Sequence, residues 1–175
     1  MTALKPIIIC IVGESGSGKS FIAQILEDKY SIPMIESRTT RPPRFEGEPG
    51  HLYVSDKEFD TYKEEDKIAF TTFGKYRYCC LIDDVSPYCS YVIDEDGLRY
   101  LREHFSSRFN IFSLRIFAYP SEREKRGTPD RIARDEGRFT MGHEDFDYIL
   151  HNNYDTNETE RKVAKMMLRV TQKFN

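Results

Sequence analysis

The strongest indication of the fold of this chain is the segment Gly13-Glu14-Ser15-Gly16-Ser17-Gly18-Lys19-Ser20. It comes directly after the apolar run Ile7-Ile8-Ile9-Cys10-Ile11-Val12, and Phe21-Ile22-Ala23-Gln24-Ile25-Leu26 follows it. The first run, rich in β-branched residues, is typical of a buried parallel strand, and the second has apolar residues at helical spacing. A glycine-rich turn could match the pattern by chance, but the flanking strand and helix favour a phosphate-binding loop.

Residues 13–20, called the phosphate loop below, carry the chemistry that a nucleoside triphosphate needs. The glycines let backbone N–H groups converge on phosphate oxygens at a helix N-terminus. Lys19 is expected to reach the β- and γ-phosphates, and the Ser20 hydroxyl to ligate Mg²⁺. The residues predicted to bind ATP are Gly13, Ser15, Gly16, Ser17, Gly18, Lys19 and Ser20.

The amino-acid composition limits the classes of protein to which this chain can belong. With 175 residues, 39% of them hydrophobic and 31% charged, the chain fits one globular domain with a real core. The net charge of −3 gives no general attraction to nucleic acid or to anionic membranes. No apolar run is long enough to span a bilayer, and nothing resembles a signal peptide. The four cysteines lack zinc-type spacing, so we expect reduced thiols and a cytoplasmic protein.

The order of elements along the chain predicts an α/β fold. A helix is expected over 56–66 from the capping-box spacing of Ser55 and Glu58, and short strands are expected in 68–93. A helix over 97–105, a strand over 111–119, two helical pieces in 120–138, a strand over 148–150 and a helix over 158–174 complete the pattern. Strands that alternate with helices indicate a three-layer fold with a mainly parallel sheet. The single domain then comprises a core of 1–35 and 89–175, an inserted lobe of 36–88, and a short lid of 121–138.

A second basic, hydroxyl-rich segment reads Ser37-Arg38-Thr39-Thr40-Arg41-Pro42-Pro43-Arg44. Arginine forks bind phosphate through two parallel hydrogen bonds, and the prolines keep the segment extended. Taken alone, the segment could be a solvated basic loop. Beside a triphosphate site it indicates a phosphorylated acceptor.

With these residues in place, the chain resembles the guanylate kinases, a branch of the nucleoside monophosphate kinases. The resemblance runs from Ile7 to about Met167. The matching elements are the phosphate loop, the 37–44 segment followed by Gly50-His51-Leu52-Tyr53, the acidic residues of Val92-Ile93-Asp94-Glu95-Asp96, Arg126-Gly127-Thr128 and Asp147-Tyr148-Ile149-Leu150-His151-Asn152.

The resemblance implies a role for each matching residue. The acceptor's phosphate would be held by Ser37, Arg41, Arg44, Tyr53 and Tyr78. Asp94 would lie near Mg²⁺, Asp96 would face the acceptor's base or ribose, and Asn152 would lie by the adenine of ATP. The lid arginines Arg126 and Arg134, with Lys19, would stabilise the transferring phosphoryl group. An N-cap carboxylate is the competing interpretation of Asp96.

Departures from the family pattern leave the acceptor's base open. In the family, a glutamate reads the guanine edge from the strand before a Tyr-Gly-Ser/Thr motif, whereas here Ala69 stands near that place. Tyr78-Cys79-Cys80 replaces the motif, so that Cys80 stands where an acceptor-binding hydroxyl is expected, and a thiol is a weak hydrogen-bond partner. The segment between Arg126 and Arg134 is also shorter than the family's lid.

Three hypotheses therefore remain after the sequence is read. The first is transfer of a phosphoryl group from Mg²⁺-ATP to a nucleoside 5′-monophosphate, with GMP or dGMP as the leading acceptor and a pyrimidine or modified nucleotide as the alternative. The second is a non-catalytic interaction module, which the intact phosphate loop disfavours. The third is a kinase for a larger acceptor, such as a modified base in DNA or a phosphorylated sugar. The lack of a basic stripe weighs against a long nucleic-acid track. Small nucleotides are the expected partners, and no oligomeric state is predicted.

Overall fold

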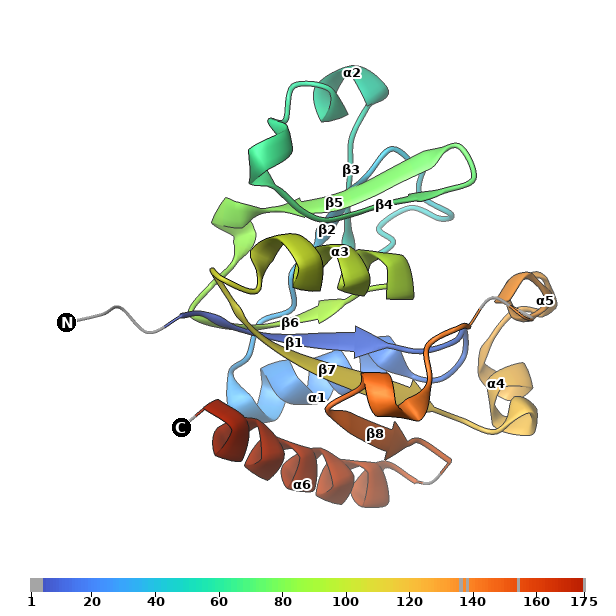
Figure 1. Cartoon of the computed structure of the whole chain (residues 1–175). Coiled ribbons are helices and arrows are strands. Elements are labelled where there is room, and N and C mark those ends of the chain that lie inside the picture. Colours follow the sequence, from blue (N-terminus) through green and yellow to red (C-terminus); the bar gives the residue numbers. More distant parts are fainter. Residues whose placement is uncertain (1–4, 136, 138, 154, 175) are drawn as a thin grey trace.

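The first of two sheets is entirely parallel. The computed structural model of the chain describes residues 5–135, 137, 139–153 and 155–174, without the side chain of Arg134. The first sheet contains β1 (Ile7–Val12), β6 (Tyr88–Val92), β7 (Asn110–Phe117) and β8 (Tyr148–His151), in the order β6-β1-β7-β8 (Figure 1). This arrangement confirms the predicted α/β class with a mainly parallel sheet.

Strand β1 is buried on both faces, which explains its unbroken apolar sequence. Alternate side chains of a strand point to opposite faces. Ile8, Cys10 and Val12 join one hydrophobic cluster, whereas Ile9 and Ile11 join another. The first cluster includes residues of α3 (Glu95–Phe105), and the second includes residues of α1 (Lys19–Tyr30) and α6 (Thr156–Phe174). Helices therefore cover both faces of the sheet (Figure 1).

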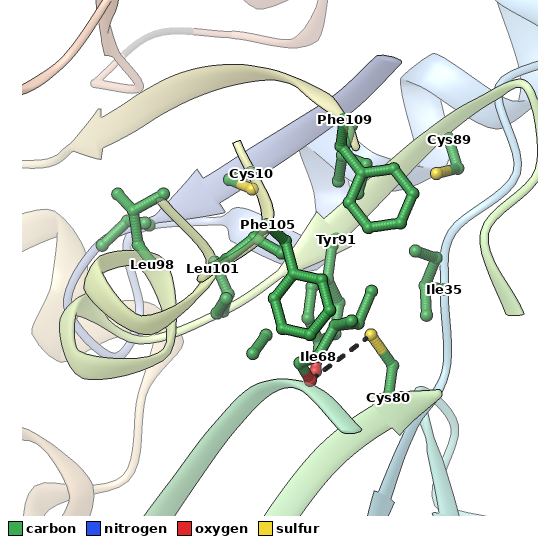
Figure 2. Close-up of a cluster of buried hydrophobic side chains, with 14 of the residues drawn as sticks. Cys10, Ile35, Ile68, Cys80, Cys89, Tyr91, Leu98, Leu101, Phe105 and Phe109 are labelled. Atoms are coloured by element: carbon green, nitrogen blue, oxygen red, sulfur yellow. Dashed lines mark hydrogen bonds between the residues drawn. The ribbon is translucent and has the colours of Figure 1, made fainter. Parts of the chain in front are cut away.

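The second sheet is mixed and is built within residues 37–81. It contains β2 (Ser37–Thr39), β3 (His51–Tyr53), β4 (Lys67–Phe73) and β5 (Tyr76–Leu81), in the order β3-β2-β5-β4. Its strand β4 packs against α3, so that α3 lies between the two sheets (Figure 1). Figure 2 shows part of this junction, where Ile68 and Cys80 of the second sheet meet Leu101 and Phe105 of α3.

The region predicted as one helix over 56–66 is broken in the structure. It forms α2 (Asp56–Phe59) and, after a turn, the 3₁₀ helix Glu64–Asp66. The predicted capping contact exists, because the Ser55 hydroxyl accepts a hydrogen bond from Glu58 N. The helix ends early where the Thr61 hydroxyl donates to the Glu58 carbonyl at 2.7 Å, a local side-chain bond that competes with helix continuation.

The lid segment forms the two helices that the sequence indicated. They are α4 (Pro120–Arg126) and α5 (Pro129–Asp135). Pro129 explains the break, because proline fits the first turn of a helix and disfavours helical backbone in the residue before it. Both helices lie beyond the carboxyl ends of the parallel strands (Figure 1).

Strand β4 contains a bulge at Ala69. The pairing of β4 with β5 shifts by one residue between Ile68 and Thr71. Ala69 is buried there and has a φ of 53°, in the left-handed region that favours glycine. A buried alanine in this conformation is strained and is held only because the surrounding structure determines it.

All four cysteines are free and buried, as expected for reduced thiols. Burial raises the pKa of Cys79 and of Cys89 to about 11, so these thiols stay protonated. Among the described helices, none has both the length and the apolar character needed to cross a membrane.

Candidate functional site

A cleft of about 650 Å³ brings the phosphate loop together with the second sheet. Its lining includes many of the residues singled out from the sequence, namely Gly13, Ser15, Gly16, Gly18, Lys19, Ser20, Ser37, Arg44, Tyr78, Asp94 and Arg126. The volume lies in the range of small-molecule sites. Most of residues 13–20 therefore line one cleft together with Ser37 and Arg44 of the basic segment.

The phosphate loop needs two of its glycines for reasons of space and backbone conformation. Gly16 has a φ of 77°, and a Cβ atom there would lie 2.6 Å from the Arg123 carbonyl oxygen. Gly18 has a φ of 98°, and a Cβ atom would lie 2.2 Å from Asn152 Nδ2. Any side chain at these positions would push the loop off its supports.

Side chains from α4 and from the end of β8 hold the phosphate loop from behind. Arg123 is buried, donates through Nε to Ser15 O at 3.1 Å, and pairs with Glu14 through Nη1 at 2.8 Å. Asn152 Nδ2 donates to Ser17 O at 2.8 Å, and its Oδ1 accepts from the Thr159 hydroxyl at 3.2 Å. Asn152 therefore supports the loop backbone.

The anion-binding side of the loop is in contact with a carboxylate of the lid. The Ser15 N–H, one of the groups expected to face phosphate, donates to Asp135 Oδ2 at 2.6 Å. Lys19 Nζ donates to Gly13 O at 2.7 Å and to Glu14 O at 3.1 Å. Arg126 lines the same cleft and donates through Nη1 to Asn152 O at 2.8 Å.

Two of the lining residues have the chemistry to take part in a magnesium site. Ser20 is exposed to the cleft, and Asp94 lines it. Asp94 caps α3 by accepting from Gly97 N at 2.8 Å, while Thr71 Oγ1 lies 3.4 Å from its Oδ2. Among the described residues, no group of three or more His, Cys, Asp or Glu side chains could hold a metal by itself. This donor set suits Mg²⁺ that is bound mainly by substrate phosphates and water, which is its usual mode in kinases.

The basic segment is organised around one buried carboxylate, Glu48. Arg41 pairs with it through both guanidinium ends, at 3.1 and 2.9 Å. Arg44 donates to it from its backbone N at 2.7 Å and from Nη1 at 2.8 Å. Burial alone would raise the pKa of Glu48, but the hydrogen bonds from Arg41, Arg44 and Tyr53 lower it to about 2. Glu48 is therefore ionised and holds both arginines in place.

The predicted acceptor residues divide into two groups. Ser37, Arg44 and Tyr78 line the cleft together with Glu48. Arg41 and Tyr53 contact Glu48 but are not among the described lining residues. Arg41 is buried, and the Tyr53 hydroxyl lies 3.5 Å from the Glu48 carbonyl oxygen.

Other predicted site residues stay outside the described cleft lining. Cys80 is fully buried in the cluster of Figure 2, where its Sγ lies 3.9 Å from Ile68 O. Asp96 is exposed in the first turn of α3 and pairs with Arg99, whereas the N-cap of this helix is Asp94. Ser17 is fully buried within the loop. The side chain of Arg134 falls outside the described part of the chain.

Several residues of the site are not predicted by the sequence analysis. Glu48, His51 and Asp135 line the cleft, and Arg123 anchors the loop. Arg123 had a usable signal, because it precedes Arg126 by one helical turn. The others carry no local signature, since their partners lie on other elements.

The comparisons with known proteins show a likeness in fold to solved structures of kinases. No protein-family model matches the chain, and no curated protein matches it in sequence. Its structure is similar to that of guanylate kinase from Anaplasma phagocytophilum, with a TM-score of 0.65 and 20% identity over 96% of this chain and 87% of that one. It is also similar to a gluconokinase from Sinorhizobium meliloti 1021 (TM-score 0.54, 13% identity, 98% and 97% covered). A sugar kinase from Janibacter sp. HTCC2649 has a TM-score of 0.53 and 11% identity, with 95% of both chains covered.

Proposed function

We propose that this protein transfers the γ-phosphoryl group of ATP to a nucleoside 5′-monophosphate and releases ADP and the diphosphate. The observation that carries the proposal is one cleft lined both by a complete phosphate loop and by Arg44 with the Glu48 network. A nucleoside monophosphate kinase needs two such anion sites, because the donor and acceptor phosphates must meet in line.

Charge neutralisation and positioning supply most of the catalysis in phosphoryl transfer. In the proposed reaction, the amides of the phosphate loop and Lys19 hold the β- and γ-phosphates. Ser20 and Asp94 would hold Mg²⁺, which would supply charge neutralisation at the transferring group. Arg126, which already lines the cleft, moves onto that group, and Arg134 is proposed to join it from α5.

The acceptor's phosphate is proposed to bind at Arg44 and Tyr78, with Arg41 and Tyr53 keeping Glu48 in place. The sequence resemblance and the similarity to a guanylate kinase structure favour GMP or dGMP. A different base is the alternative, because the buried Ala69 replaces the expected carboxylate and the buried Cys80 replaces the expected hydroxyl. The complete loop disfavours a non-catalytic module.

A coupled assay of ADP release across all common ribo- and deoxynucleoside monophosphates tests the proposal. We expect Mg²⁺-dependent turnover with at least one of them. Lys19→Ala should lower kcat by about 100-fold or more, because a positioned cation on the transferring group is lost. Turnover of sugars but of no monophosphate would contradict the proposal, and so would a Lys19→Ala variant with parental activity.

A further inference from the structure

His51 lies on the cleft wall, where its imidazole is fixed by a neighbouring strand. It begins β3 and is paired in register with Ser37 of β2. The Ser37 hydroxyl and His51 Nδ1 are 2.7 Å apart. Because Nδ1 is engaged in this way, Nε2 is the ring nitrogen left for a ligand. His51 is half-buried and lines the same cleft as Lys19 and Arg44.

The surroundings of His51 favour its uncharged form. Burial lowers its pKa, and the nearby Arg41 and Arg44 lower it further, while Glu48 and Ser37 oppose the change. The ring lies 6.0 Å, between centroids, from each of the aromatic rings of Tyr53 and Tyr78. A neutral imidazole in an aromatic wall suits an uncharged polar group better than a phosphate, which the arginines beside it can hold.

Two described residues, at the places where the family resemblance puts readers of the base, offer a nucleobase little hydrogen bonding. Ala69 presents a methyl group, and Cys80 is buried in the core. Ser37 is 5% exposed, and its hydroxyl is bonded to His51, so it can act on a ligand by fixing that ring. Thr71 lines the cleft farther along, beside Asp94.

We infer that His51 reads the acceptor's base through one hydrogen bond from or to Nε2, and that Ser37 is the positioning residue that fixes the ring. The inference rests on the proposed function, and it names a specificity residue in place of the absent carboxylate. Its physical basis is that a site built around a buried polar group rejects a ligand that leaves that group unpaired.

Two substitutions of His51 distinguish the contribution of Nδ1 from that of Nε2. His51→Asn keeps an amide near Nδ1 for Ser37 and removes the group at Nε2, whereas His51→Gln places an amide near Nε2. For the preferred monophosphate, His51→Asn should lower kcat/KM by about 10- to 100-fold and reduce the selectivity between bases. His51→Gln should restore part of that selectivity. The KM for ATP should stay within about twofold of the parent's in both variants.

His104→Asn is the matched control, because His104 is exposed on α3 and stacks on Tyr100. It should leave every kinetic constant unchanged. Thermal unfolding of each variant identifies a loss of fold. A folded His51→Asn variant that keeps the parent's ratios of kcat/KM between monophosphates with different bases would overturn the inference. An equal loss with every monophosphate would overturn it too, because it would place His51 at the phosphate.

Histidine NMR on the wild-type protein gives a readout that does not depend on turnover. Titration with the monophosphates should shift the His51 ring signals most for the preferred base, and Ser37→Ala should change the ring ¹⁵N shifts that report its tautomer. If the parent phosphorylates no monophosphate, the proposed function fails by itself. If the His51 signals then fail to move with any of these probes, the inference fails as well.

Discussion

Arg44 is the arginine of the basic segment that lines the cleft, and its guanidinium is held by Glu48 at 2.8 Å. Arg44→Lys should raise the acceptor's KM by roughly 10-fold, because a point charge cannot reproduce a planar fork on phosphate. The KM for ATP should change much less. Steady-state kinetics with each substrate varied in turn measures both constants. Arg161→Lys, at an exposed ion pair on α6, is the control. A rise confined to the KM for ATP would place Arg44 at the donor site.

Glu48 connects stability to pH through its lowered pKa. Its carboxylate is ionised in the folded protein down to a pH of about 2, against an ordinary value of 4.5. The stability that it contributes is therefore complete above pH 4.5 and is lost as the pH falls toward 2. Urea unfolding between pH 2 and pH 7 should show a gap between the parent and Glu48→Gln that is largest at neutral pH. The gap should be about 2–4 kcal/mol there, and it should shrink through this acid range. A gap independent of pH would mean that the charge of Glu48 contributes nothing.

Among the elements, those with a strong apolar pattern are the ones that the sequence predicts well. The run before the phosphate loop is short, apolar throughout and rich in β-branched residues, which favours a strand buried on both faces, and the C-terminal helix shows one apolar stripe. The bulge at Ala69 has no such signal, since alanine is not a turn former and the conformation is imposed by the pairing of β4 with β5. The early end of α2 likewise depends on local side-chain bonds.

The site is predictable only where one segment carries the whole chemistry. Residues 13–20 carry a complete anion-binding pattern within one segment, so their spacing alone predicts such a site. The acceptor side depends on contacts between β2, β3 and the loop that carries Glu48, and none of these contacts is visible in one sequence. Cys80 shows that a match in sequence position is not sufficient. It stands where the family has an acceptor-binding hydroxyl, yet it packs in the core.

Helix α5 carries the carboxylate that binds the phosphate loop through the Ser15 N–H. In the proposed function a phosphate oxygen needs the same N–H, so ATP would have to displace Asp135. Asp135→Asn removes the negative charge and should strengthen ATP binding by about 3- to 10-fold, measured by calorimetry. Asp130→Asn, at an exposed position on the same helix, should have no effect. Weaker ATP binding by Asp135→Asn would contradict this competition and would give Asp135 a role in holding the nucleotide or its metal.

At the scale of the whole molecule, both predicted anion sites contain a carboxylate of the protein itself. Asp135 bonds to the phosphate loop, and Glu48 bonds to Arg41 and Arg44. The two differ in their setting, because Glu48 is buried among its partners, whereas Asp135 comes from a short helix at the end of the lid. Substrate binding is therefore expected to move α5 more than the loop that carries Glu48.

Hydrogen exchange over the whole chain tests whether α5 moves on substrate binding while α4, the other helix of the lid, stays in place. Arg123 is buried and ties α4 to the phosphate loop, so the amides of α4 should be protected in the free protein and change little. The α5 amides should gain protection when a non-hydrolysable ATP analogue and the acceptor bind together, because a closing lid completes the site and excludes water. The first sheet is the internal control and should stay unchanged. Equal gains in α4 and α5 would mean that the lid closes as one rigid unit, and no gain in α5 would mean that it does not close at all.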